Sequence, residues 1–291
     1  MSAIRNVALF GKTGSAEVVE ALVALLDSLH ARGLNVLVEE GIAADLGMVA
    51  AAAAIDSIAA NADVAIVLGG DGTLLAAARR LAAHDVPLVG INQGRLGFMT
   101  DIARADMLAA IERLLAGEFA ADRRMLLDVR VVRNGAEVFA TLALNDVVAN
   151  KGDMGRMIEI KVCVDGDFLY VLRADGMIVA TPTGSTAYAL SANGPILHPA
   201  VPGIALVPLC PHGLTHRPIT IADTSRIEMA LVATYDARLH CDGQNTFELT
   251  AGDVVSVARS THAVTLLHPP GYSYFAMLRE KLHWSATPRR S

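Results

Sequence analysis

The sequence lacks long apolar runs and clusters of basic residues. Its longest apolar runs, such as residues 48–55, fall far short of the ~20 residues that a membrane helix requires. It contains no run of Lys or Arg, and its formal net charge is −6. We therefore expect no membrane partner and no nucleic-acid partner, whereas nucleotides could still bind through a local basic pocket.

Cysteine is scarce, and the N-terminus shows no secretory leader. The three cysteines, Cys163, Cys210 and Cys241, are widely spaced and odd in number, which suits a reducing compartment better than a disulfide framework. We expect them to be small buried apolar residues. Residues 1–6 lead directly into a strand pattern without an apolar leader segment, so the sequence predicts a cytoplasmic protein.

Strand and helix patterns alternate over the first ~120 residues. The chain has 291 residues, 53% of them hydrophobic, which is enough for two domains with buried cores. The alternation predicts an α/β domain with an open, mostly parallel sheet and ligands at the carboxyl ends of its strands. The expected elements are strands at 4–10, 35–38, 64–68 and 87–91, and helices at 16–31, about 46–60 and from 74 onward.

Beyond residue 125 the pattern indicates a mostly antiparallel, β-rich domain, with Asp165-Gly166 as a two-residue hairpin turn. We place the domains at residues 1–124 and 125–269, and expect segment 270–291, helical over 272–284, to pack back on another element. No Pro/Ser linker separates the domains, so we expect a cleft between them. The expected strands cover 126–132, 157–164, 226–233, 253–258 and 263–267.

The first candidate site is a glycine loop that follows the apolar strand 64–68. It reads Gly69-Gly70-Asp71-Gly72-Thr73, and a helix pattern begins directly after it. Glycines allow a backbone to approach an anion closely, and the N–H groups at the start of a helix point toward the same space. Asp71 either takes part in chemistry or caps the helix by accepting backbone N–H bonds.

Two polar stretches interrupt the β-rich half. Asn145-Asp146 breaks the apolar run 140–148, either as a bulge or turn or as a binding site. Residues 181–188, Thr-Pro-Thr-Gly-Ser-Thr-Ala-Tyr, place four hydroxyl groups around one glycine, which suits a phosphate or a sugar as well as a Ser/Thr-rich helix start. His212 and His216 are four residues apart, but Gly213 between them favours a surface loop over a zinc site.

In their order and spacing, residues 69–73, 145–146 and 181–188 resemble the NAD kinase family, which phosphorylates the 2′-hydroxyl of the adenosine ribose of NAD. The resemblance covers nearly the whole chain and extends to residues 92–98, 193–197 and 268–275. It implies the two-domain fold of that family, ATP with Mg²⁺, and NAD as the phosphoryl acceptor. It also implies a homodimer or homotetramer. Since the product of this reaction is the substrate plus one phosphate, we also expect NADP or NADPH to inhibit at the dinucleotide site.

The resemblance also assigns roles to residues. Asp71 is the base that takes the proton from the ribose 2′-hydroxyl. Asn145 binds adenine, and Asp146, where the family more often has the longer Glu, binds the ribose hydroxyls. The phosphate contacts are Gly69, Gly70, Gly72 and Thr73, and the other dinucleotide contacts are Asp175, Thr186, Ala187, Tyr188 and Ser191, with Arg156, Arg173 and Gln244 as further candidates.

Two other classes of protein share the glycine loop. A lipid or sphingoid-base kinase would add an apolar groove or a basic amphipathic helix for membranes, and no such segment is visible in the sequence. A non-catalytic dinucleotide-binding regulator would keep the glycines without needing Asp71. An assay for ATP-dependent formation of NADP separates the three classes.

Overall fold

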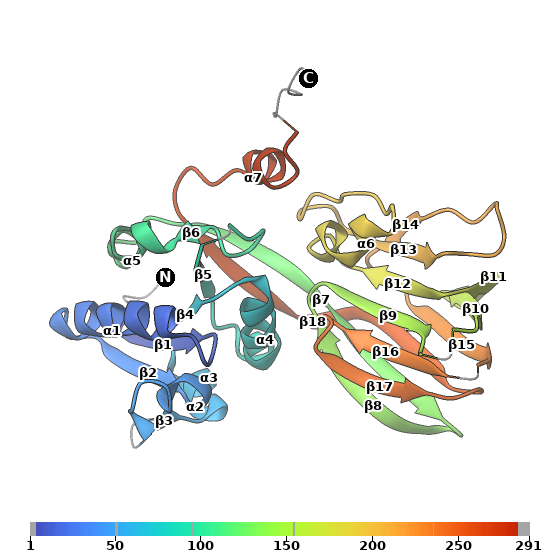
Figure 1. Ribbon diagram of the computed structural model, residues 1–291, viewed down its shortest axis with the longest axis horizontal. Coiled ribbons are helices and arrows are strands. Elements are labelled where there is room, and N and C mark those ends of the chain that lie inside the picture. Colours follow the sequence, from blue (N-terminus) through green and yellow to red (C-terminus); the bar gives the residue numbers. More distant parts are fainter. Residues whose placement is uncertain (1–3, 50–51, 95, 154, 235, 285–291) are drawn as a thin grey trace. The chain divides into compact units, whose positions relative to one another are not determined.

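The computed structural model describes residues 4–49, 52–94, 96–153, 155–234 and 236–284, which form two compact units (Figure 1). Unit 1 contains the described residues up to Arg123 and from Val264 onward, and unit 2 contains those from Arg124 to Ala263. Two strands, β7 (Ala120–Arg133) and β18 (Val254–His268), begin in one unit and end in the other. The bounds predicted from the sequence are 124 and 269; in the structure the chain returns to unit 1 at Val264.

Unit 1 contains an α/β sheet whose described strands pair in parallel. The remaining elements are β1 (Asn6–Gly11), α1 (Ala16–Ala31), β2 (Asn35–Glu39), α2 (Glu40–Ala43), β3 (Ala52–Ala53), α3 (Ile55–Asn61), β4 (Val64–Leu68), α4 (Asp71–Leu81), η2 (Ala82–His84), β5 (Leu88–Asn92), β6 (Ile102–Ala103), η3 (Arg104–Asp106), α5 (Met107–Leu115) and α7 (Tyr274–Lys281).

The order of this sheet is β5-β4-β1-β2-β3, with β6 and the end of β18 also paired to β5. The interior strand β4, between β5 and β1, is buried at all five positions, as its β-branched run predicts. Helix α1 has the predicted bounds, because apolar residues from Val18 to Leu29 recur at helical spacing and are buried. The open, parallel α/β sheet predicted from the sequence is confirmed.

Unit 2 is a two-sheet β structure. Besides β7 and β18 it contains β8 (Ala136–Ala143), β9 (Asp146–Lys151), β10 (Ile158–Val164), β11 (Asp167–Ala174), β12 (Gly176–Ala180), η4 (Gly184–Thr186), α6 (Tyr188–Ser191), β13 (Gly203–Leu209), β14 (Ile219–Ala222), β15 (Ile227–Ala233), β16 (Ala237–Cys241) and β17 (Asn245–Leu249).

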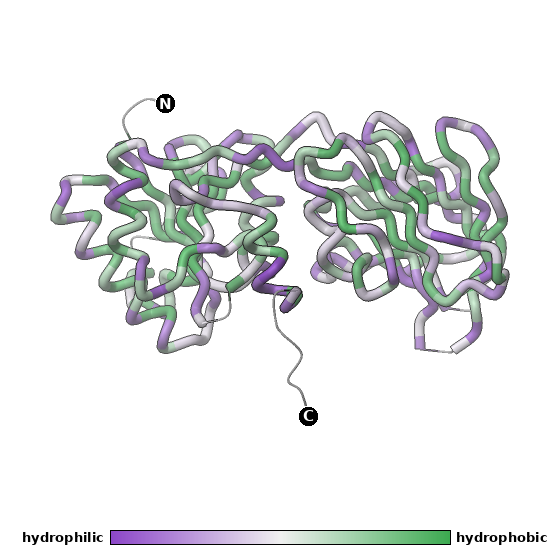
Figure 2. Tube along the Cα trace, turned by 90° about the horizontal axis from the view of Figure 1, so that it is seen from above, coloured by the Kyte–Doolittle hydropathy of each residue, from purple (hydrophilic) through white to green (hydrophobic). Residues whose placement is uncertain are grey.

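One sheet of unit 2 has the order β14-β13-β12-β9-β16-β17 and is antiparallel throughout. The other contains β11, β10, β15, β18, β7 and β8, and the inward residues of both sheets form one core that includes Leu127, Val179 and Leu239. Figure 2 shows apolar residues along the inner strands of each unit. Asp165 and Gly166, both at positive φ, form the predicted turn between β10 and β11.

Three local predictions are wrong. The helix expected at 46–60 begins only at Ile55, because Gly47 adopts a left-handed φ of 68° and β3 pairs with β2. The strands expected at 253–258 and 263–267 are one strand, β18. Cys210 is exposed and Cys163 half-buried, so of the three cysteines expected to be buried Cys241 alone is.

Among the residues that the structure describes, no helix has the length and apolarity to cross a membrane. Arg95 of the motif at 92–98, residues 50–51 of the expected helix, and residues 285–291 lie outside the described part of the chain.

Candidate functional site

The glycine loop follows the carboxyl end of β4, as predicted, but α4 begins within it at Asp71, three residues before the predicted start. A Cβ atom on Gly69 would lie 2.5 Å from Oγ1 of Thr73, so this position requires glycine. Gly70 and Gly72 are exposed beside the start of the helix. The loop therefore presents bare backbone to solvent at a helix N-terminus, an arrangement that favours anions.

The carboxylate of Asp71 is held by a second loop rather than by its own helix. Its Oδ2 accepts the N–H of Phe98 at 2.8 Å, and its Oδ1 accepts the N–H groups of Met99 and Thr100 and the hydroxyl of Thr100, each at 3.1 Å. No side chain caps α4, so the reading of Asp71 as a helix cap is wrong. The carboxylate is fixed in one orientation at the carboxyl end of the sheet.

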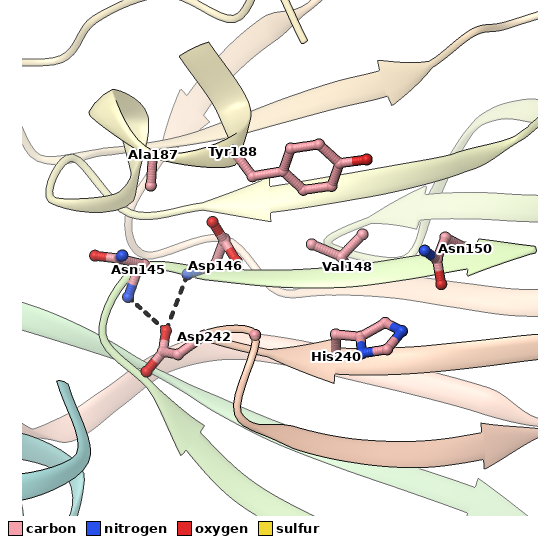
Figure 3. Close-up of a pocket in the computed structure, with 9 residues that line it drawn as sticks. Asn145, Asp146, Val148, Asn150, Ala187, Tyr188, His240 and Asp242 are labelled. Atoms are coloured by element: carbon pink, nitrogen blue, oxygen red, sulfur yellow. Dashed lines mark hydrogen bonds between the residues drawn. The ribbon is translucent and has the colours of Figure 1, made fainter. Parts of the chain in front are cut away.

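Unit 2 contains a pocket of about 400 Å³ on the outer face of the sheet β14-β13-β12-β9-β16-β17 (Figure 3). Successive strand residues point to opposite faces, so when Val147 and Ala149 enter the core, Asp146, Val148 and Asn150 line the pocket. The same alternation on β16 sends Leu239 and Cys241 inward. Ala187 and Tyr188 lie on one side of β9, and His240 and Asp242 on the other (Figure 3). Gly243 completes the lining.

Asp242 organises the turn that carries Asn145 and Asp146. Its Oδ1 accepts the N–H groups of Asn145 at 2.7 Å and Asp146 at 3.2 Å, and its Oδ2 accepts that of Leu144 at 3.0 Å. Asn145 Oδ1 is buried without a hydrogen-bond partner among the described residues. Since such a group is costly to leave unsatisfied, it is suited to a polar ligand group entering the pocket.

The hydroxyl-rich stretch is tied to the same turn. Thr181 Oγ1 donates to the carbonyl of Leu144 at 2.6 Å and accepts the N–H of Gly184 at 3.1 Å, and Thr181 N–H donates to the carbonyl of Asn145 at 2.9 Å. Ser185 Oγ accepts the N–H of Leu197 at 2.9 Å. These hydroxyls serve structure, because they fix the start of α6 and thereby place Ala187 and Tyr188 at the pocket.

Asp146 has a perturbed carboxyl group. Burial, with the negative charge of Asp242 as a second cause, raises the pKa of Asp146 to about 7. Near neutral pH this side chain is therefore divided between a protonated form, which can donate a hydrogen bond, and a charged form, which only accepts.

The raised pKa of Asp146 predicts that the ligand-free protein loses stability as the pH rises. The unfolded chain releases the proton near the ordinary value of 3.8, whereas the folded protein keeps it to about pH 7, so the loss accumulates between these values and is complete above them. Asp146→Asn removes this dependence. In urea titrations, the free energy of unfolding of Asp146→Asn minus that of wild type should increase by up to ~1.4 kcal/mol for each pH unit across this range. A difference independent of pH would contradict this prediction.

The pocket gathers four of the predicted dinucleotide contacts, namely Asn145, Asp146, Ala187 and Tyr188. Ser191 lines a neighbouring pocket of about 510 Å³, which shares Tyr188 and also contains Cys210, His216 and Arg217. The ring of His216, in this second pocket, packs edge-on against the ring of Tyr170.

The other candidates do not line the first pocket. Thr186 donates its hydroxyl to the carbonyl of Thr183, and Asp175 pairs with Lys151 Nζ at 2.8 Å. Arg156, Arg173 and Gln244 are exposed.

Sequence analysis missed Val148, Asn150, His240, Asp242 and Gly243. Burial, followed by the charge of Arg238, lowers the pKa of His240, so this ring is neutral at neutral pH. A signal for Asp242 was present, because Asp-Gly between two alternating strands predicts a tight hairpin turn. Both residues have positive φ, 54° and 64°.

Among the described residues, no group of three or more His, Cys, Asp or Glu side chains is arranged to hold a metal ion. These residues therefore fit Mg²⁺ only if it arrives with a nucleotide. In that mode phosphates and water supply most of the ligands, and the protein supplies one or two carboxylates.

Comparison with known proteins covers both units. A model of the ATP-NAD kinase N-terminal domain matches residues 7–119, and a model of the ATP-NAD kinase C-terminal domain matches residues 144–268. The chain is 61% identical over 288 residues to an NAD kinase of Aromatoleum aromaticum, covering 98% of this chain and 96% of the relative.

Two solved structures share the fold. A yeast NADH kinase complexed with NADH superposes with a TM-score of 0.91 at 23% identity, covering 100% of this chain and 91% of that one. An NAD kinase from Archaeoglobus fulgidus in complex with ATP has a TM-score of 0.74 at 24% identity, covering 96% and 98%.

Proposed function

Because this chain belongs to the NAD kinase family and is therefore a phosphotransferase, we propose that it transfers the γ-phosphoryl group of ATP to the 2′-hydroxyl of the adenosine ribose of NAD, yielding NADP. The observation that carries this proposal is the pocket in unit 2, where a buried amide oxygen and a buried carboxyl group face a volume within the usual range for small-molecule sites.

In this proposal the pocket holds the adenosine half of NAD. The amide of Asn145 bonds the adenine edge, which offers both donors and acceptors. Asp146 bonds the ribose hydroxyls, and the ring of Tyr188, 46% exposed without ligand, is available to cover the base. Asp175, Thr186, Ser191, Arg156, Arg173 and Gln244 are proposed for the remainder of the dinucleotide.

Asp71 is proposed as the general base. A charged carboxylate has about four lone-pair positions, and Oδ1 already accepts three hydrogen bonds whereas Oδ2 accepts one. Oδ2 is therefore the oxygen with capacity to accept the proton of the 2′-hydroxyl. Fixing the carboxylate before the substrate arrives reduces the reorganisation needed during reaction.

The phosphates of ATP are proposed to contact the loop Gly69, Gly70, Gly72 and Thr73 at the start of α4. Mg²⁺ bound with ATP would offset negative charge on the transferred phosphoryl group, and Asp71 is the carboxylate that this loop offers toward it.

The test is an assay for ATP-dependent conversion of NAD to NADP, run beside a panel of lipid and sphingoid-base acceptors. Formation of NADP alone supports the proposal. Phosphorylation of a lipid would favour the lipid-kinase alternative, and binding of NAD without turnover would favour a non-catalytic regulator.

We propose that NADP or NADPH inhibits at the same pocket, because contacts to the adenosine half do not involve the nicotinamide ring. Asp146→Ala should weaken both NAD and NADPH by ~1–3 kcal/mol, since it leaves buried polar groups of each ligand unpaired. Inhibition kinetics and calorimetry measure the two effects. An unchanged NADPH potency beside a raised KM for NAD would place the inhibitor elsewhere. Asp167→Ala, at an exposed carboxylate of β11, should change neither value.

We also propose a homodimer or homotetramer in the cytoplasm. The three cysteines are widely spaced and odd in number, which suits a reducing compartment better than a disulfide framework. On strands β11 and β15 of unit 2, Phe168, Val171 and Val232 are 60%, 44% and 54% exposed, which suits a surface that another copy covers. Sedimentation equilibrium of the full chain tests the assembly.

A further inference from the structure

The loop that orients Asp71 is attached at both ends to residues near the C-terminus. We propose that the segment from His268 to Lys281 positions the Asp71 carboxylate by fixing the path of residues 96–101, and that His268 and Lys281 are positioning residues for phosphoryl transfer. All these residues belong to unit 1. This inference rests on the proposed role of Asp71 as the base.

The first attachment joins Asp101 to His268. Nδ1 of His268 lies 2.9 Å from Oδ2 of Asp101, and the two side chains are 1% and 4% exposed. Oδ1 of Asp101 has no hydrogen-bond partner among the described residues, so within that part of the chain the carboxyl group is bonded through Oδ2 to His268 alone. Since an unpaired buried carboxylate is costly, the contact fixes where residue 101 can lie.

His268 is itself fixed. It follows the part of β18 that pairs with β5, its ring stacks on Tyr272 with centroids 3.8 Å apart and an interplanar angle of 6°, and its Nε2 lies 3.7 Å from Oδ2 of Asp122. Because these contacts restrict the His268 ring, its contact with Asp101 links residue 101 to the sheet.

The second attachment joins Lys281, at the end of α7, to the other end of the loop. Its ammonium group donates to the carbonyl of Leu96 and lies 5.7 Å from the centroid of the Phe98 ring. The helix α7 is seated through Tyr274, Met277 and Leu278, which are 8%, 7% and 3% exposed. The lysine is therefore carried by a packed helix.

Between these attachments, the three consecutive N–H groups of residues 98–100 converge on Asp71. The fit is tight: a Cβ atom on Gly97 would lie 2.1 Å from Asp71 Oδ1. Inner support comes from Asn92, whose Nδ2 donates to the carbonyls of Thr100 and Ile102 at 3.2 and 3.1 Å. Small displacements of Leu96 or Asp101 would thus change the orientation of the Asp71 carboxylate.

The principal test is Lys281→Met in the full chain, with Arg279→Met as the matched control. Arg279 is exposed on the same helix. Because a misplacement of about 1 Å can cost ~10²-fold in rate, we expect Lys281→Met to lower kcat by ~10-fold with the KM for NAD within about twofold. Arg279→Met should match wild type. An unchanged kcat, or an equal loss in both variants, would overturn the inference.

A second pair of variants tests the other attachment. His268→Asn retains a donor where Nδ1 lies, whereas His268→Leu removes it. We expect His268→Asn to keep at least several-fold more kcat than His268→Leu when both are measured well below their melting temperatures. If the two variants lose equal kcat at comparable stability, the Asp101 contact does not position the loop.

A double-variant cycle separates this inference from the base assignment. If Lys281 acts through Asp71, adding Lys281→Met to Asp71→Asn should cost little further kcat, whereas independent action would multiply the two losses. A full multiplied loss refutes the positioning role and leaves the base intact. Near-normal turnover of Asp71→Asn alone would instead refute the base.

Discussion

Replacing Asp71 by asparagine is expected to lower kcat by ~10²-fold or more while the dissociation constant for NAD changes by no more than a few-fold. The amide keeps the size of the carboxylate but cannot take the proton of the 2′-hydroxyl. If Oδ1 stays toward Met99 and Thr100, the new NH₂ group faces the N–H of Phe98, so we also expect a loss of ~1 kcal/mol in stability. Steady-state kinetics and calorimetry measure these effects.

Asp63→Asn is the control for the stability effect. Asp63 also lies in unit 1, and its Oδ2 accepts the N–H groups of Arg5 and Asn6, each at 2.8 Å. It should lose comparable stability and keep its kcat. Turnover of Asp71→Asn near that of wild type would remove Asp71 from the role of base.

Gly184→Ala is expected to raise the dissociation constant for NAD by at least ~10-fold. A Cβ atom at this position would lie 2.0 Å from the carbonyl oxygen of Asn145, and that carbonyl already accepts the N–H of Thr181. Backbone cannot yield as a flexible side chain can, so the start of α6 must move and take Ala187 and Tyr188 away from Asn145. Overpacking of this kind also costs ~1–3 kcal/mol of stability.

Gly203→Ala provides the comparison for this variant. Gly203 begins β13 in the same sheet, and a Cβ atom there would first meet a methyl group of Thr220 at 3.0 Å. Calorimetric titration with NAD, below both melting temperatures, should show wild-type affinity for Gly203→Ala. Unchanged affinity in Gly184→Ala would mean that the two walls of the pocket are not coupled through this contact.

Local patterns explain which elements the sequence could predict. Helix α1 and strand β4 were predictable because their apolar spacing matches the faces that they bury. The alanine-rich stretch before Ile55 was not, because high helix propensity there is overridden by the pairing of Ala52 and Ala53 with Val38 and Glu39. Propensity is a local quantity, and this pairing is a tertiary one.

The same distinction applies to the candidate site. The resemblance to known kinases supplied Asn145, Asp146 and Tyr188, and strand alternation from the Asp242-Gly243 turn could have added His240. The three N–H groups on Asp71 could not have been found in this way. They come from a different loop of unit 1, and no spacing rule relates residue 71 to residues 98–100.

The division of unit 1 into two stretches of chain has a consequence for biosynthesis. Everything up to residue 123 leaves the ribosome before unit 2, and at ~10 residues per second residues 124–263 require on the order of 10 s more. During that time β5 lacks its partner in β18, and the loop beside Asp71 lacks both of its attachments. The sheet that carries the pocket of unit 2 ends in sequence with β17 at Leu249, before His268 and Lys281 are synthesised. We therefore expect the nascent chain to acquire this pocket before the loop beside Asp71 is ordered.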